Sequence, residues 1–153
     1  MVLVITPIFR LRLQLNFKGG LEIMTYSTDL SQANSEIVIS SPRINSAKIR
    51  QFIHMVSKKQ AQGVTVSVIT IPPEEYPDNR IEPTKKLIDE LSGAGIYVKV
   101  TSGIHEHFAV IDKEIVWYGS MNMLSRAKED DNLMRINNKE IADELLKIGF
   151  GKT

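Results

Sequence analysis

The sequence contains no cysteine and has no uninterrupted apolar run of the length that crosses a membrane. The absence of cysteine excludes disulfide bonds and thiolate metal sites, and it fits a reducing compartment, so we expect a cytoplasmic protein. The apolar opening, residues 1–9, is about half as long as a membrane span and runs into Arg10 and Arg12. We therefore expect no targeting segment and no membrane partner.

Negative charge is missing from one long stretch of the chain. No Asp or Glu occurs from Ile37 to Pro73, although the whole protein has a net charge of only +1. Five basic residues in this stretch could bind nucleic acid: Arg43, Lys48, Arg50, Lys58 and Lys59. The alternative is that they merely form the solvated face of a helix.

The length of 153 residues and the hydrophobic content of 42% indicate one globular domain with a core of its own. We place this domain at residues 25–153 and treat residues 1–24 as an N-terminal strand extension. Within the extension, apolar and polar residues alternate from Phe9 to Phe17, which is the pattern of a half-buried strand.

Strand and helix patterns alternate through the main domain. The predicted strands are residues 36–40, 64–71, 96–100, 105–111, 115–118 and 132–136, and the predicted helices are residues 45–62, a helix from about residue 83, and residues 138–148. We expect Ile141, Leu145 and Ile148 to form the inner face of the last helix. The pattern predicts an α/β fold with a mixed, largely parallel β-sheet flanked by helices on both faces.

The segment 105–122 carries the strongest functional pattern and reads HEHFAVIDKEIVWYGSMN. It resembles the phospholipase D superfamily signature H-x-K-x4-D-x6-G-S-x-N, and every spacing agrees. Five of the six defined residues match: His105, Asp112, Gly119, Ser120 and Asn122. The resemblance extends over about residues 25–146. It is strongest to single-motif members, which include small bacterial nucleases and modules of helicase-like and restriction proteins.

The resemblance implies a phospholipase D-like fold and a metal-independent phosphodiesterase, most simply a nuclease that needs no cofactor. His105 would attack phosphorus and form a phosphohistidine. The Ser120 hydroxyl, the Asn122 amide and nearby backbone N–H groups would stabilise charge on the phosphate oxygens.

A carboxylate near the following strand would orient the nucleophilic histidine, as in other histidine-dependent sites. Asp131 is the expected residue, and Glu129 and Asp130 are its alternatives. Asp112 completes the signature, but its position in the strand pattern is opposite in parity to that of His105. We therefore expect Asp112 to anchor a turn rather than to contact substrate.

The one departure from the signature is His107, which replaces a lysine. A histidine is positively charged for only part of the time near neutral pH, whereas a lysine is a fixed charge. Three interpretations follow. The site works with protonated His107, or it binds phosphate without cleaving, or His105 and His107 together hold a metal ion. On a strand, residues 105 and 107 would project to the same face.

The chain contains one signature, whereas the superfamily reaction uses two. The resemblance therefore implies a homodimer in which a second His105 protonates the leaving group. We expect a nucleic-acid substrate, with DNA favoured over RNA, and a helicase or restriction system as a possible partner. The alternatives are a non-catalytic DNA- or RNA-binding module of such a system and a lipid phosphodiesterase.

Overall fold

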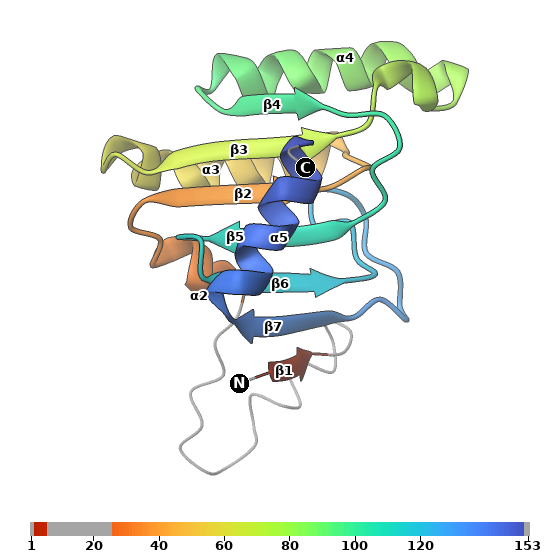
Figure 1. Ribbon diagram of the computed structural model, residues 1–153. Coiled ribbons are helices and arrows are strands. Elements are labelled where there is room, and N and C mark those ends of the chain that lie inside the picture. Colours follow the sequence, from red (N-terminus) through yellow and green to blue (C-terminus); the bar gives the residue numbers. More distant parts are fainter. Residues whose placement is uncertain (1, 6–25, 152–153) are drawn as a thin grey trace.

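The computed structural model describes residues 2–5 and 26–151 (Figure 1). Residues 2–5 form strand β1 (Val2–Ile5), which pairs antiparallel with the last strand of the main domain. The predicted strand from Phe9 to Phe17 lies outside the described residues. No helix in the described ranges is both long enough and apolar enough to cross a bilayer.

The described strands form one seven-stranded sheet in the order β1-β7-β6-β5-β2-β3-β4. After β1, the strands are β2 (Glu36–Ser40), β3 (Thr65–Thr70), β4 (Tyr97–Val100), β5 (His107–Ile111), β6 (Ile115–Gly119) and β7 (Leu133–Asn137). The mixed α/β sheet is confirmed, and each predicted strand of the main domain is present within two residues of its expected ends.

The expectation that the sheet is largely parallel is wrong. Only β2 with β3 and β3 with β4 pair in parallel, and the other four described pairs are antiparallel. The connections explain this arrangement. Helices link β2 to β3 and β3 to β4, whereas a turn of three residues links β5 to β6, and so short a turn can join only antiparallel strands.

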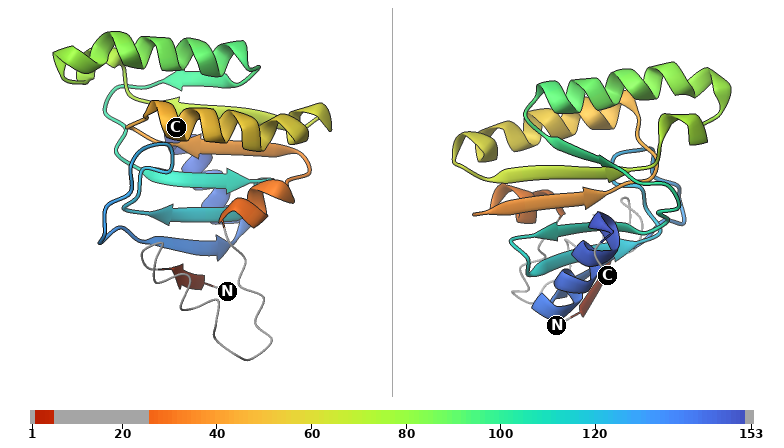
Figure 2. Two further views of the ribbon diagram at one scale, coloured as in Figure 1. Left: turned by 180° about the vertical axis from the view of Figure 1, so that it is seen from behind. Right: turned by 45° about the horizontal axis from the view of Figure 1, so that its top comes forward.

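Helices cover both faces of the sheet, as expected (Figures 1 and 2). The helices are α2 (Tyr26–Ser31), α3 (Ser46–Ala61), α4 (Asp78–Gly93) and α5 (Lys139–Phe150), with a short 3₁₀ helix, η1 (Pro73–Glu75). Helices α2 and α3 lie on one face and α5 crosses the other, while α4 runs beside the edge strand β4. Asn45 caps α3 by accepting a 2.9 Å hydrogen bond from the Lys48 N–H, and Asn138 caps α5 in the same way.

Helix α4 begins five residues before the position predicted from Pro83, which lies inside the helix. Its first turn starts directly after Pro77, whose fixed φ of −53° sets the direction of the chain into the helix.

The inner face of α5 also differs from the prediction. Ala142, Leu145 and Gly149 are buried, whereas Ile141 and Ile148 are exposed. A Cβ on Gly149 would lie 2.5 Å from the Ile69 side chain and 3.1 Å from the Phe108 ring. Helix α5 therefore contacts the sheet through its smallest residues, and this close packing turns the two isoleucines outward.

A buried polar cluster joins α2 to the sheet. The Asp29 carboxylate accepts a 2.7 Å hydrogen bond from the Trp117 indole N–H and forms a two-pronged ion pair with Arg135, at 2.7 and 3.1 Å. Asp29 is only 4% exposed, so all of its charge is balanced inside the protein. Trp117 therefore belongs to the core.

Candidate active site at one end of the sheet

All signature residues except Asp112 gather where four strands start or end, at the right-hand end of the sheet in Figure 1. Strand β5 begins at His107, which pairs with Gly119 at the end of β6, and Gly119 in turn pairs with Leu133 at the start of β7. On the other side of β5, Phe108 pairs with Ser40 at the end of β2. The carboxyl ends of the parallel strands β2 and β3 thus share this edge, the usual place for ligands in α/β sheets.

His105 lies two residues before β5, on the connection from β4. The strand does not extend to His105 because the Glu106 carbonyl accepts a 2.7 Å hydrogen bond from the buried Ser40 hydroxyl in place of a ladder bond. The His105 N–H is held at 3.2 Å from the Glu106 carboxylate. The expectation that His105 and His107 share a strand face is therefore wrong, because only His107 belongs to the strand. His105 is exposed, and its ring makes no hydrogen bond in the described part of the chain.

His107 is half-buried, and its Nδ1 lies 3.2 Å from the Gly119 carbonyl oxygen. A carbonyl oxygen can only accept, so Nδ1 carries the proton of this hydrogen bond. The other nitrogen, Nε2, then has a lone pair in the neutral ring and becomes a donor only when the ring is protonated. His107 can therefore donate a hydrogen bond to a phosphate oxygen only in its charged form.

Gly119 is required by a close approach within the chain itself. A Cβ at this position would lie 2.0 Å from the Asn132 carbonyl oxygen and 3.0 Å from the Leu133 Cα. The Asn132 carbonyl accepts a 3.1 Å hydrogen bond from the Ser120 N–H. Glycine at the end of β6 thus lets the loop of Gly119, Ser120 and Asn122 close against the start of β7.

Ser120 and Asp131 form a fixed pair. The Ser120 hydroxyl donates to Asp131 at 2.9 Å and accepts from the Asn132 N–H at 3.0 Å. The second Asp131 oxygen accepts a 2.7 Å bond from the Lys128 N–H, and Asp131 is only 9% exposed. The expectation that Asp131 holds the His105 ring is therefore wrong. The Ser120 hydroxyl proton is used in the hydrogen bond to Asp131, so this hydroxyl is not a free donor for a phosphate oxygen. The two residues instead shape the loop between β6 and β7.

The alternatives to Asp131 point elsewhere. Glu129 and Asp130 are exposed, and neither side chain makes a hydrogen bond or ion pair within the described residues. None of the three acidic residues therefore bonds to the His105 ring in the described part of the chain.

Asn122 links the signature loop to the loop that follows β2. Its side-chain oxygen accepts a 2.9 Å hydrogen bond from the Arg43 N–H, which leaves the amide NH₂ as a donor for a ligand. Two further bonds join the same loops, from the Leu124 N–H to the Ser41 hydroxyl at 3.2 Å and from the Asn45 N–H to the Leu124 carbonyl at 2.9 Å.

Asp112 lies at the opposite end of β5 and anchors a turn, as expected. Its carboxylate accepts hydrogen bonds from the N–H groups of Asn34, Ser35 and Glu36 and from the Ser35 hydroxyl, at 2.7 to 3.1 Å. Burial acts to raise the pKa of Asp112, but these hydrogen bonds outweigh it and hold the pKa below that of a free aspartate. Asp112 is remote from the site and belongs to the structural framework.

The five predicted nucleic-acid-binding residues do not form one cluster. Arg43 and Lys48 lie beside the start of α3, close to the signature loop. Arg50 pairs with Glu90 of α4 at 3.2 Å. Lys58 and Lys59 lie in the last turn of α3, which has 16 residues. At a rise of 1.5 Å per residue, Lys58 is about 15 Å along the helix axis from Lys48.

Tyr76 is a structural residue of the site that sequence reasoning missed. Its hydroxyl donates to the Pro42 carbonyl at 2.7 Å and accepts from the Ile44 N–H at 3.2 Å, and the Arg43 guanidinium lies 4.9 Å from its ring centre. Burial raises the pKa of Tyr76, while hydrogen bonds and the charges of Arg43 and Arg80 act to lower it. The only sequence signal was its position in a Pro-rich loop.

The described residues contain no group of three or more His, Cys, Asp or Glu placed to bind a metal ion. His105 and His107 therefore have no third ligand of these types in the part of the chain that the structure describes.

Comparison with known proteins agrees with the motif and the fold. A family model described as "Cardiolipin synthase, PLD-like domain" matches residues 26–148. No curated protein sequence matches the chain.

Solved structures share the fold at low identity. Nuc from Salmonella typhimurium, a phospholipase D family member, superposes with a TM-score of 0.70 at 15% identity, over 99% of this chain and 93% of that one. NucT from Helicobacter pylori gives 0.70 at 14% identity, over 99% and 94%. The archaeal chromatin protein TrmBL2, described as having a novel mode of DNA binding, gives 0.58 at 16% identity, over 99% of this chain and 51% of that one.

Proposed function

Because the chain belongs to the PLD-like domain family of the phospholipase D superfamily, we propose that it is a metal-independent nuclease that acts through a phosphohistidine on His105. One observation carries the proposal. The fold brings His105, His107 and the loop of Gly119, Ser120 and Asn122 to one end of the sheet, with the His105 ring exposed and free of competing hydrogen bonds in the described part of the chain.

In the first step, a neutral His105 ring nitrogen attacks phosphorus. A P–N bond forms as the P–O bond to the leaving alcohol breaks, and charge grows on the other phosphate oxygens. The Asn122 amide and a protonated His107 donate hydrogen bonds to those oxygens. Asp131 acts indirectly, because it fixes Ser120 and thereby the loop that carries Asn122.

The leaving oxygen needs a proton, and His105 of the partner subunit supplies it in a homodimer. That second histidine, now neutral, takes a proton from water as the water oxygen attacks phosphorus. The P–N bond then breaks and His105 is released. A homodimer is proposed because the chain carries a single signature.

A nucleic-acid substrate, with DNA favoured, fits the exposed site and the positive charge beside it. Arg43 is exposed, and its backbone N–H is bonded to Asn122 itself. A positively charged residue at this position can bind a backbone phosphate next to the one that is cleaved.

The test is cleavage of labelled single- and double-stranded DNA and RNA by the purified protein in excess EDTA. We expect cleavage of DNA that EDTA does not inhibit and that Asn122→Ala reduces by about 100-fold, the typical cost of removing one such donor. His105→Ala should abolish it. Cleavage that requires a divalent metal ion, or that survives His105→Ala, would contradict the proposal.

A binding module without catalysis is the second candidate, and His107 favours it. The family lysine is absent, and one nitrogen of its replacement is already committed to the Gly119 carbonyl. Salt-sensitive DNA binding without cleavage, even after His107→Lys, would support this candidate.

A further inference from the structure

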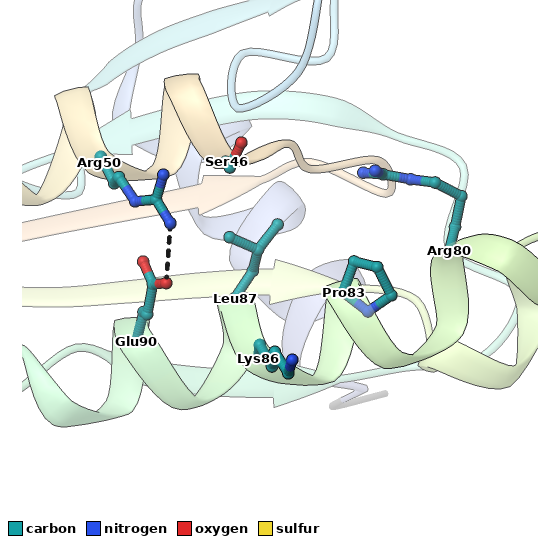
Figure 3. Close-up of a pocket in the computed structure, with 7 residues that line it drawn as sticks. All are labelled: Ser46, Arg50, Arg80, Pro83, Lys86, Leu87 and Glu90. Carbon is teal, nitrogen blue, oxygen red and sulfur yellow. Dashed lines mark hydrogen bonds and ion pairs between the residues drawn. The ribbon is translucent and has the colours of Figure 1, made fainter.

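A pocket of about 170 Å³ lies between α3 and α4, outside the proposed cleavage site (Figure 3). Three of its lining side chains are positive and one is negative: Arg50, Arg80, Lys86 and Glu90. Ser46, Pro83 and Leu87 complete the lining. We propose that this pocket binds a backbone phosphate of the nucleic acid several nucleotides away from the cleaved bond, an inference that rests on the nuclease function proposed above.

Two of the three positive side chains in the pocket, Arg80 and Lys86, are not neutralised by an ion pair in the described part of the chain. Arg80 and Lys86 make no ion pair within the described residues, whose ion pairs on α4 are Arg50 with Glu90 and Lys85 with Glu82. The Arg50 side chain is 66% exposed, so its pair with Glu90 adds little stability and the guanidinium can turn to a ligand. In Figure 3, Arg50 and Glu90 face each other across the pocket from α3 and α4.

We infer that Arg43 connects the pocket to the proposed cleavage site. The Arg43 backbone is bonded to Asn122, and its guanidinium lies over the Tyr76 ring. The charge of Arg80, which lines the pocket, also acts to lower the pKa of Tyr76. An extended polyanion leaving the cleavage site past Arg43 therefore meets Arg80 and the pocket next.

The proposed path does not include the C-terminal end of α3, where Lys58 and Lys59, two of the predicted binding residues, lie. Lys58 and Lys59 follow the start of α3 by more than three turns and lie near the start of β3, at the end of the sheet opposite to the signature loop. The pair Lys58 and Lys59 therefore provides a matched control for Arg80 and Lys86, because reversing either pair changes the net charge by the same amount.

The experiment measures binding of a fluorescein-labelled DNA oligonucleotide to the full-length His105→Ala protein by anisotropy, from 50 to 200 mM KCl. We expect Arg80→Glu with Lys86→Glu to weaken binding at least tenfold and to lower the salt slope by about one, because the contact with one phosphate is lost. The milder pair Arg80→Gln with Lys86→Gln should weaken binding in the same direction. Lys58→Glu with Lys59→Glu should leave the slope unchanged.

Equal losses for the two reversed pairs would overturn the proposal, because they would report net charge alone. Absence of oligonucleotide binding by the parent protein, or preferred binding to phosphatidylglycerol vesicles through Arg80 and Lys86, would also overturn it. Thermal melting of each variant identifies any that are unfolded. If the glutamate pair is unfolded, the binding affinity of Arg80→Gln with Lys86→Gln tests the proposal instead.

A second substrate separates the failure of this proposal from the failure of the nuclease function. Bis(p-nitrophenyl) phosphate is a small diester that reaches only the cleavage site. With an intact His105, Arg80→Glu with Lys86→Glu should cleave it at the parent rate while losing activity on the oligonucleotide. If the protein cleaves neither substrate but still binds the oligonucleotide through Arg80 and Lys86, the proposed nuclease function is wrong and the proposed role of the pocket stands.

Discussion

At the scale of single residues, the site depends on which protons are already committed. The Ser120 hydroxyl donates a hydrogen bond to the Asp131 carboxylate, and His107 Nδ1 donates one to the Gly119 carbonyl. The donors that remain for a phosphate are the Asn122 amide and, after protonation, the Nε2 of His107. A site of this kind gains its positive charge from pH rather than from a fixed lysine.

His107→Lys tests this reading. Nε2 of His107 can donate only from the protonated ring, so cleavage by the parent protein should weaken as the pH rises. The lysine variant keeps its charge and should be roughly tenfold more active than the parent at pH 8, with a smaller gain at pH 6. Steady-state cleavage rates from pH 5 to 8 check the prediction.

His107→Gln is the control, since glutamine can bond the Gly119 carbonyl but has no charge. It should remain weak at every pH. Equal pH profiles for His107→Lys and the parent would show that another group controls the dependence.

At the scale of elements, one carboxylate links the end of β5 to the start of β2. Asp112 accepts three backbone N–H groups of residues 34–36, and it sits in the left-handed region with a φ of 55°. These hydrogen bonds explain why the signature contains Asp112. They fix the register of β5 against β2, and β5 begins with His107 at its other end.

Asp112→Asn should lower the free energy of unfolding at pH 7 by about 1–3 kcal/mol, because Asn cannot accept all these hydrogen bonds. The folded-state pKa of Asp112 is lowered, so its contribution is present above the ordinary aspartate pKa and is lost as the pH falls through the lower folded value. Urea unfolding at pH 7, 5, 4 and 3 should show the gap between the two proteins narrowing below about pH 4.

Asp89→Asn on α4 is the matched control, since Asp89 is exposed and makes no hydrogen bond or ion pair in the described part of the chain. A gap for Asp112→Asn that is absent at pH 7, or that is constant down to pH 3, would contradict the assigned role.

Local signals were enough to predict some elements and not others. The caps Asn45 and Asn138 act on N–H groups three residues away, so the starts of α3 and α5 were readable from sequence. The orientation of α5 was not, because it follows from the contact of Gly149 with Ile69 and Phe108, which are remote in the chain.

The candidate site divides in the same way. The spacing of the signature placed His107 and the 119–122 loop correctly at one edge, since strand pairing follows directly from a short hairpin. The hydrogen-bond partner of Asp131 could not be predicted from the sequence. The signature makes both Ser120 and His105 possible partners, and the conformation of the β6–β7 loop determines that Asp131 bonds to Ser120. The α4 side of the pocket was missed because Arg80 and Lys86 follow the stretch that lacks acidic residues.

At the scale of the whole molecule, the proposed mechanism gives each chain half of a two-histidine centre, and the proposed basic path leads away from it. The single signature calls for a second copy of the chain, and the path from Arg43 to the α3–α4 pocket accommodates a substrate longer than one diester. The half-site lies where β2, β5, β6 and β7 start or end, whereas the path continues over α3 and α4.

The most direct test of the account is to trap the covalent intermediate. Protein mixed with end-labelled DNA in EDTA and quenched in alkali, where phosphohistidine is stable, should carry the label on the peptide that contains His105, and His105→Ala should carry none. DNA cleavage by the parent protein without any label on His105 would contradict the central claim.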